Sequence, residues 1–228
     1  MSLDILYEDN HLIVLNKRSG EIVQGDKTGD LCMADGIKQF LKVRDSKPGN
    51  VFCGVVHRLD RPVSGVCIFA KTSKALSRMN ALIKERDFQK TYWAVVKSGE
   101  WRVESGELRD WLLRNEKQNK SYVVKPGTPG AKEALLDYEL LAMSRGGYGL
   151  VEVHLHTGRH HQIRCQLAHA GMPIKGDLKY GAPRSNPDGS ISLHARRVEF
   201  EHPVSHQHLL IEAPPPSEFQ RMFPEFSK

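Results

Sequence analysis

The stretch that decides the fold is YGLVEVHLHTGRHHQIR at residues 148–164. From Val151 to His156 apolar and polar side chains alternate, which is typical of a strand with one buried face. Residues 157–158, Thr-Gly, end the alternation, and the run RHHQIRCQLAHA that follows has helical character. The sequence therefore predicts a strand that leads through a tight turn into a helix rich in Arg and His.

Working outward, the same periodicities predict more strands than helices. Two apolar-rich runs within residues 4–17 are separated by Glu-Asp-Asn, which predicts an N-terminal hairpin. Further strands are expected at residues 51–60, 64–72, 88–97, 107–114, 121–125, 134–143, 191–200 and 208–213. Helices are expected over about 31–44, from an N-cap at Ser73 to about 85, and near the C-terminus. Adjacent runs of strands favour an α+β fold with a large, mostly antiparallel sheet over a doubly wound parallel one.

Composition places the chain among ordinary globular proteins. It has 228 residues, of which 39% are hydrophobic and 26% charged, and no linker is long or polar enough to separate two domains. We therefore expect one domain over residues 1–228. No apolar run approaches the ~20 residues that span a bilayer, and the start lacks the pattern of a signal peptide, so we expect a cytoplasmic protein. The 33 Lys and Arg against 27 Asp and Glu, a net charge of +6, favour a polyanionic partner such as nucleic acid.

Cysteine and histidine offer little for a metal site. The four cysteines, at positions 32, 53, 67 and 165, form no CxxC pair, and we expect buried thiols. Four histidines crowd residues 154–161, and a His-x-His pair on one strand face is able to ligate zinc. No suitable carboxylate or cysteine ligand stands nearby, so we expect no metal, and a zinc hydrolase stays an alternative hypothesis.

The segment HRLD at residues 57–60 is the first candidate for chemistry. A strand-like apolar run delivers Asp60 to a turn that contains Pro62 and Gly65, and functional side chains often occupy such positions. Asp60 there suits a nucleophile, a general base or a cation ligand. The structural alternative stays open at this point: Asp60 caps the turn or pairs with a neighbouring arginine.

Basic and aromatic residues supply the second and third candidates. Arg159 and Arg164, at the start of the predicted helix, suit binding of a phosphate or orientation of a carboxylate. From Arg159 to Arg197 there are seven basic residues and two acids, which favours a phosphate-binding surface over a merely solvated charged face. Tyr92 and Trp93 point to opposite faces of their predicted strand. Tyr92 suits stacking on a base, and packing within the protein is the alternative.

Five motifs in this order are specific together. They are HRLDxxxSG at residues 57–65, KTYWAVV at 90–96, LHTGRHHQIR at 155–164, HAGMPIKGDLKYG at 169–181, and the LHA and FEHP elements within 193–203. With the opening DILYEDNHLIVLNKRSG, they make the chain similar to the RluA-type branch of the pseudouridine synthases, from about Asp4 to about Phe223. His57 before Arg-Leu-Asp resembles this branch rather than the RsuA-type branch. We expect no S4-type RNA-binding domain before the resemblance.

The resemblance implies the pseudouridine synthase catalytic fold, a large mixed and mainly antiparallel sheet with flanking helices and a central RNA-binding cleft. It implies an isomerase that converts specific uridines of rRNA or tRNA to pseudouridine, without cofactor or metal, and a monomer is the family-like state. It also implies that Asp60 is the essential carboxylate, that Tyr92 stacks on the target uracil and takes a proton, and that Arg164 pairs with Asp60.

The resemblance assigns further residues to RNA contact. Arg58 matches the position that enters the RNA helix beside the extruded base, and Leu193 matches the apolar wall of the site. We place the other RNA contacts on side chains of the same motifs: Lys17, Arg159, His161, Gln162, Lys175, Lys179 and Arg197. The chain departs from the common family pattern at three positions, none of which removes a group that the reaction requires: Arg18 for Pro, Val63 for Thr and His160 for Thr. An RNA-binding or assembly factor that keeps the fold without catalysis is the main alternative.

Overall fold

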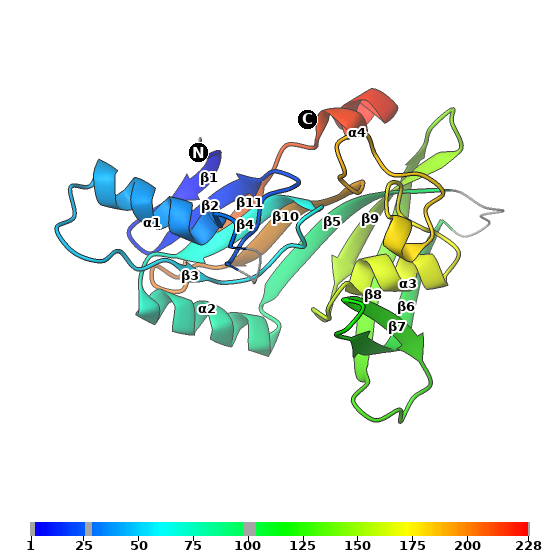
Figure 1. The fold of residues 1–228 in the computed structure, drawn as a ribbon, viewed down its shortest axis with the longest axis horizontal. Helices are drawn as coiled ribbons and strands as arrows, with labels where there is room; N and C mark the ends of the chain where they lie inside the picture. The colour runs from blue at the N-terminus through cyan, green and yellow to red at the C-terminus, as the bar shows by residue number, and fades with distance from the viewer. Residues whose placement is uncertain (1–2, 26–28, 98–103, 228) are drawn as a thin grey trace. The chain divides into compact units, whose positions relative to one another are not determined.

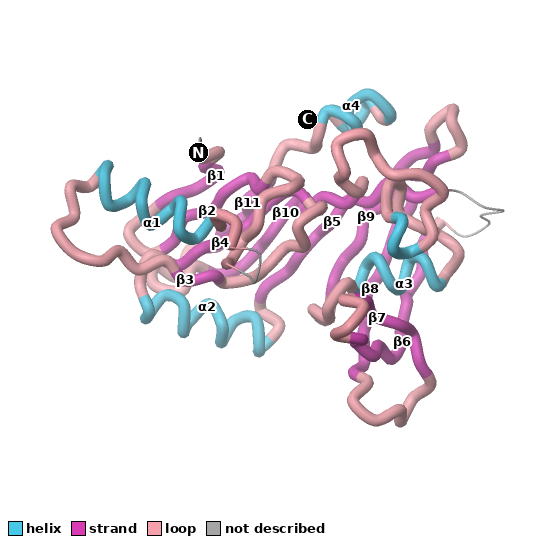
Figure 2. The backbone as a smooth tube through the Cα atoms, viewed as in Figure 1, coloured by secondary structure: helices cyan, strands magenta, loops and turns pink. Residues whose placement is uncertain are grey.

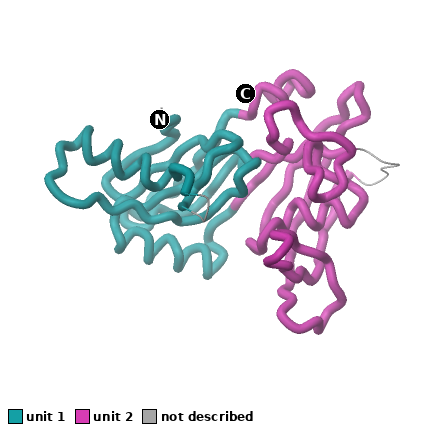
Figure 3. Tube along the Cα trace, viewed as in Figure 1, with its two compact units in different colours: residues 1–89, 195–214 teal, residues 90–194, 215–228 magenta. Residues whose placement is uncertain are grey.

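The computed structural model describes residues 3–25, 29–97 and 104–227. Its helices and strands form two compact units, drawn in different colours in Figure 3 and as a ribbon in Figure 1. Unit 1 consists of residues 1–89 and 195–214, and unit 2 consists of residues 90–194 and 215–228. The expectation of one catalytic domain over residues 1–228 stays a prediction.

The strands of unit 1 begin with a hairpin, and the β1–β2, β2–β4, β3–β4 and β10–β11 pairs are antiparallel. They are β1 (Ile5–Glu8), β2 (Leu12–Lys17), β3 (Gly54–Val55), β4 (Ser64–Ala70), β10 (Leu193–Glu201, from residue 195 onward in this unit) and β11 (His208–Glu212). They are hydrogen-bonded in the order β1-β2-β4-β10, with β3 on β4 and β11 on β10. The predicted N-terminal hairpin is confirmed, since Asp9 Oδ1 accepts the N–H groups of His11 and Leu12, both at 2.7 Å, in its turn.

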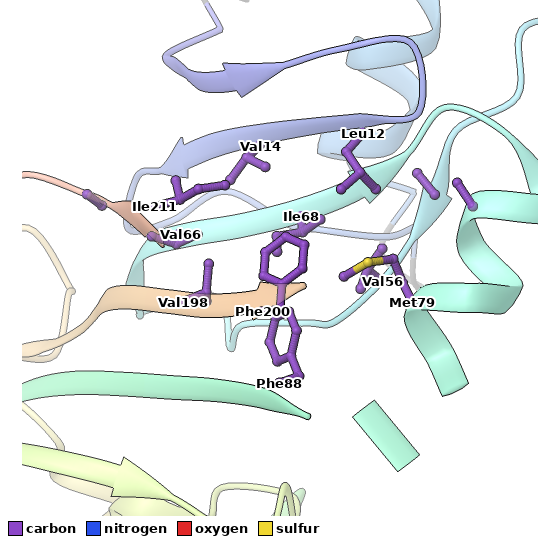
Figure 4. Packing of buried hydrophobic residues seen from close by; sticks show 13 residues of the cluster. Leu12, Val14, Val56, Val66, Ile68, Met79, Phe88, Val198, Phe200 and Ile211 are labelled. Carbon is purple, nitrogen blue, oxygen red and sulfur yellow. The ribbon is translucent and has the colours of Figure 1, made fainter. Parts of the chain in front are cut away.

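The core of unit 1 forms on both faces of these strands. Val14 of β2 lies opposite Ile68 of β4, and Met79 of helix α2 (Ser73–Glu85) belongs to the same buried cluster (Figure 4). Ile13 and Phe69 point to the other face and are also fully buried. Each such side chain stabilises the fold by about 1.5–3 kcal/mol relative to exposure, so this part of the sheet is held firmly from both sides.

Unit 2 contains a five-stranded antiparallel sheet with short helices. Its strands are hydrogen-bonded in the order β5 (Phe88–Lys97, from residue 90 onward in this unit), β9 (Tyr148–Leu155), β8 (Lys132–Met143), β6 (Ser105–Asn115) and β7 (Lys120–Val124). Its helices are α3 (Gln162–His169), η1 (Leu178–Tyr180), α4 (Ser217–Met222) and η2 (Pro224–Phe226). Cys165 of α3 packs with Ala134 of β8 on one sheet face. Phe219 of α4 packs with Trp93 of β5 on the other.

The α+β class with a mostly antiparallel sheet is confirmed, and Figure 2 shows the predominance of strands. In unit 1, helix α1 (Met33–Arg44) agrees with the prediction for residues 31–44. Three local predictions were wrong. The segment 51–60 is a strand only at β3, because the chain leaves the sheet beyond Val55. The cap of α2 is Thr72, whose Oγ1 accepts the N–H of Ala75, rather than Ser73. Helix α3 begins only at residue 162, because His161 has a left-handed φ of 52°.

Candidate active site

Asp60 stands at the head of a tight turn in unit 1. Its side chain is half-buried, and its carbonyl oxygen accepts the N–H of Val63 at 3.0 Å. Leu59 beside it is buried at 8% exposure, whereas Arg58 is exposed. The alternation anchors the segment through Leu59 and leaves Arg58 at the surface, where an RNA contact is feasible.

Lys17, at the end of β2, holds the turn beyond Asp60 through hydrogen bonds to backbone carbonyls. Its side chain is 0% exposed, and its Nζ donates to the carbonyl oxygens of Val63 at 2.6 Å, Arg61 at 3.0 Å and Arg18 at 3.1 Å. These three bonds use all three N–H groups of the ammonium. Since its donors are used on backbone carbonyls, Lys17 supports the turn in this structure, and the contact with phosphate stays a prediction.

The same segment binds the turn at further points. Ser19 Oγ donates to the carbonyl of Pro62 at 3.1 Å, and the N–H of Gly20 donates to the carbonyl of Arg61 at 2.8 Å. Each of the three carbonyl groups that follow Asp60 is thus bound by residues 17–20. We call this arrangement the turn clamp. It restricts the backbone that carries the Asp60 carboxylate, which is what a preorganised site requires.

Burial also changes the titration of Lys17. It lowers the pKa of the ammonium to about 8, and the nearby charge of Asp60 is among the groups that oppose this shift. Lys17 therefore remains mostly protonated at pH 7 and keeps its three donors, although it loses them at a lower pH than an exposed lysine does.

Gly65 allows β4 to approach β10 directly after the turn. Its φ is +112°, and a Cβ at this position would lie 2.2 Å from the carbonyl oxygen of Ala195. Only glycine avoids both the strain and the clash. The glycine of the HRLDxxxSG motif thus has a structural cause. Farther along β10, Arg197 is half-buried and lies opposite Glu212 of β11.

In unit 2, Tyr92 and Trp93 face opposite sides of the sheet, as the sequence predicts. Tyr92 is 7% exposed and lies opposite Val153 of β9, which in turn lies opposite Tyr138 of β8. Trp93 donates through Nε1 to Glu152 at 2.9 Å on the other face. Ala134 lies four residues before Tyr138 on β8 and therefore points to the same face as Tyr138 and Tyr92. Ala134 packs with Cys165 of α3, so α3 covers this face.

Arg164 of α3 is held by a buried carboxylate that sequence reasoning did not single out. Its Nε and Nη2 donate to Asp177 at 2.6 and 2.9 Å, and the two side chains are 6% and 1% exposed. The guanidinium also lies over the ring of Tyr180, 5.2 Å from its centroid. The bidentate pair fixes the plane of the guanidinium and does not involve Nη1. Asp177 is one of only two acids between Arg159 and Arg197, and this rarity was the available signal.

The turn before α3 is held by side chains for which we predicted RNA contacts. Gln162 is 3% exposed; its Oε1 accepts from Thr157 Oγ1 at 2.8 Å and from the N–H of Arg159 at 3.0 Å, and its Nε2 donates to Leu135 O at 3.1 Å. His161 is 8% exposed, with Nδ1 3.0 Å from the hydroxyl of Tyr180. Both polar groups are buried and bonded within unit 2, and their contacts with RNA stay predictions.

The remaining basic positions of unit 2 differ in exposure. Lys179 donates to Asn119 O at 3.0 Å. Because its side chain is exposed, its charge still reaches a polyanion at the surface. Lys175 is half-buried and ion-paired with Glu218, and Arg159 donates through Nε to the carbonyl of Glu133. Leu193, expected as an apolar wall, is buried at 4% exposure.

The structure thus brings two of the three predicted catalytic residues to one face of unit 2, the face with Tyr92 and with α3, which carries Arg164. Asp60 belongs to unit 1, and its pairing with Arg164 stays a prediction. Within residues 3–25, 29–97 and 104–227, no group of three His, Cys, Asp or Glu side chains is placed to hold a metal ion. The described helices include none long and apolar enough to cross a membrane.

Comparison with known proteins gives one consistent family. A family model described as RNA pseudouridylate synthase matches residues 11–169, more than half of the chain. The chain is 32% identical over 224 residues to an uncharacterized RNA pseudouridine synthase of Synechocystis, covering 96% of this chain and 68% of that protein. It is 34% identical over 221 residues to ribosomal large subunit pseudouridine synthase C of Buchnera aphidicola, covering 92% and 67%.

Solved structures agree at the level of the fold. The structure of human RNA pseudouridylate synthase domain containing 4 matches with a TM-score of 0.79 and 24% identity, over 98% of this chain and 92% of that chain. Human RNA pseudouridylate synthase domain containing 1 matches with a TM-score of 0.73 and 23% identity, over 99% and 88%. At such identities the likeness shows the fold alone.

Proposed function

Because this chain belongs to the RNA pseudouridylate synthase family, we propose that it isomerises specific uridines of ribosomal RNA to pseudouridine, with Asp60 as the essential carboxylate. The chain is an RNA-modifying isomerase by its family. The choice of ribosomal RNA over tRNA rests on relatives named ribosomal large subunit pseudouridine synthases C and D, at 33–34% identity.

The reaction asks for little beyond positioned side chains. The N1–C1′ bond of uridine breaks, the uracil rotates, C5 bonds to C1′, C5 loses its proton and N1 gains one. Asp60 acts on the ribose, either by attacking C1′ or by taking the 2′ proton. Tyr92 stacks on the loosened base, a contact worth about 1–3 kcal/mol, and accepts the C5 proton. Since all atoms are conserved, the reaction consumes no co-substrate.

Arg164 completes the proposed site as the cation that keeps Asp60 ionised. Asp177 holds its guanidinium through Nε and Nη2, so the fork is oriented before any RNA binds. The observation that carries the proposal is the turn clamp. Residues 17–20 donate hydrogen bonds to the three successive carbonyls beyond Asp60, and these bonds restrict the position of its carboxylate.

RNA contact is proposed for the basic side chains that reach the surface. Arg58 and Lys179 are exposed, and Arg197 is half-buried. Contacts of this kind supply affinity that does not depend on sequence and falls with salt.

We further propose that the protein works as a cytoplasmic monomer without metal or cofactor, which light scattering and metal analysis of the purified protein test directly.

The deciding experiment compares pseudouridine maps. Ribosomal RNA from a strain that lacks the chain is mapped after complementation with the wild type, Asp60→Asn or the control Asp87→Asn, which removes an exposed carboxylate in the same unit. We expect the wild type and the control to restore the same sites and Asp60→Asn to restore none while still binding the RNA. Restoration by Asp60→Asn overturns the assignment of the carboxylate, and unchanged maps in the deletion strain overturn the choice of ribosomal RNA. A catalytically silent factor predicts no difference among the three proteins.

A further inference from the structure

Unit 1 has a groove that takes no part in the turn clamp. One wall is helix α1, whose residues Asp35, Lys38, Gln39 and Lys42 follow the spacing of a single helix face. The other wall is residues 50–53, in the connection that leads from α1 back to β3 (Figure 1). We call this hollow of about 630 Å³ the α1 groove. Its volume is within the range of sites for small organic groups.

An aromatic ring lines the α1 groove and meets solvent. Phe52 is 42% exposed, unlike the buried phenylalanines of the core. Its ring rests against Gly54: a Cβ on that glycine would lie only 3.0 and 3.1 Å from Phe52 Cε1 and Cζ. The close approach restricts the ring on one side while the rest remains open. A supported and exposed aromatic ring is a platform on which a flat apolar group is able to stack.

The charge of the groove is positive and incompletely balanced within the described residues. Lys38 Nζ pairs with Asp35 Oδ1 at 3.0 Å, which offsets the one carboxylate among the lining residues. Lys42 takes part in no ion pair within the described ranges, whereas nearby Arg44 pairs with Glu8 and Asp45. Lys42 therefore has its charge available to an anion at the rim.

Uncharged polar groups complete the chemistry. Gln39 and Asn50 line the same hollow, and their amides donate and accept hydrogen bonds as the edges of nucleobases do. Cys53 also lines the hollow, and burial raises the pKa of its thiol to about 12, so it adds no negative charge at neutral pH. A ring to stack on, amides for base edges and a lysine for a phosphate form the set that single-stranded RNA uses.

We propose that the α1 groove binds a single-stranded segment of the RNA substrate outside the target nucleotide, with a base on Phe52 and a phosphate against Lys42. The proposal rests on the proposed function for the identity of the substrate. An acidic protein segment would use the lysine but leave the aromatic ring without a partner, so the observations favour RNA. The groove then adds affinity and helps select the RNA, and it does not touch the reacting atoms.

Binding is tested with a fluorescein-labelled oligonucleotide of ten uridines, by anisotropy across a series of salt concentrations. We expect Phe52→Ala and Phe52→Leu each to weaken binding about tenfold, because leucine keeps an apolar side chain and loses the stacking face. Lys42→Ala is expected to weaken it severalfold and to reduce the salt slope by about 1. The controls are Val43→Ala, which truncates a 75% exposed apolar side chain of the same helix, and Lys74→Ala, which removes an exposed charge from α2. Both should bind like the wild type.

A second readout separates this site from the active site. With deproteinised ribosomal RNA from the deletion strain as substrate, Phe52→Ala should raise KM about tenfold and leave kcat unchanged. Crosslinking of an oligonucleotide that carries 4-thiouridine should label the peptide that contains residues 50–53. Wild-type affinity in the Phe52 and Lys42 variants, or crosslinks confined to other peptides, rejects the groove. If the ribosomal RNA is never modified but the Phe52 variants still lose oligonucleotide binding, the proposed function fails and the groove stands.

Discussion

Replacing Lys17 by methionine removes the centre of the turn clamp and keeps a side chain of similar length. The wild-type ammonium donates three hydrogen bonds at 2.6–3.1 Å to backbone carbonyls. Bonds from a charged donor contribute about 1.5–3 kcal/mol each, so the three amount to roughly 5–9 kcal/mol. Methionine avoids the cost of burying a charge. The lowering of the pKa of Lys17 from 10.5 to about 8 corresponds to a net ~3 kcal/mol against the charged form in the folded state.

The difference predicts that Lys17→Met lowers the free energy of unfolding by roughly 2–6 kcal/mol. Urea denaturation at pH 7 measures it. Where the variant remains folded, we expect kcat for pseudouridine formation to fall by about 10²-fold, because a displacement of about 1 Å at a reacting group has that effect. The matched control is Lys71→Met, since the Lys71 side chain is only 12% exposed and its Nζ donates to Asp9 O at 2.6 Å, in the β1–β2 turn. It should lose stability and keep kcat.

The dependence on pH gives the same argument a second test. Because the folded state lowers the pKa of Lys17, the unfolded chain binds more protons between about pH 8 and 10.5, and stability rises with pH in that window. The gap between the wild type and Lys17→Met should therefore widen by up to ~3 kcal/mol from pH 8 to 10.5, since other groups titrate alike in both proteins. Equal stability of the two proteins at pH 7 would refute the clamp, and a gap that narrows above pH 8 would contradict the lowered pKa of Lys17.

Three further outcomes follow from the contacts. Gly65→Ala should abolish folding or cost more than about 3 kcal/mol in urea, because its Cβ would lie 2.2 Å from a carbonyl oxygen of β10 at a φ of +112°; a wild-type midpoint would contradict this. Asp177→Asn should cost about 3–5 kcal/mol in the same assay, because it removes the buried carboxylate that binds the Arg164 guanidinium through two hydrogen bonds. The hydrogen bond from Arg44 chiefly lowers the pKa of Glu8 to about 2, so the stability gap between the wild type and Glu8→Gln, about 1–2 kcal/mol after screening, should be full above pH 4.5 and vanish toward pH 2.

Several features of the site could be predicted from local sequence. The alternation in residues 148–156 and the turn residues before Leu12 determine strands and a hairpin, because both depend on neighbours in the chain. The opposite facing of Tyr92 and Trp93 follows from the two-residue period of a strand, and the structure has them so. The placement of Asp60 in a turn beside Pro62 was likewise visible in the sequence.

Long-range contacts decided what each polar residue does. Lys17 and Gln162 both carry polar groups of the kind that bind RNA. In the structure, Lys17 donates to backbone carbonyls 44 and 46 residues away, and Gln162 bonds to the backbone around its own turn. In the sequence, Asp177 entered only the count of charges. The structure shows that it accepts hydrogen bonds from Arg164, 13 residues away. Phe52 was one apolar residue of a presumed strand, and it emerged at the surface because the chain forms only two residues of β3.

By itself, then, the sequence determined the strands, the turns and which side-chain groups are present for binding and catalysis, since these follow from the order of neighbouring side chains. The tertiary structure alone decided which lysines, glutamines and acids are bonded inside the protein and which still face a partner. The physical reason is that a buried polar group must find its hydrogen-bond partners wherever the fold brings them, and sequence distance does not limit that search.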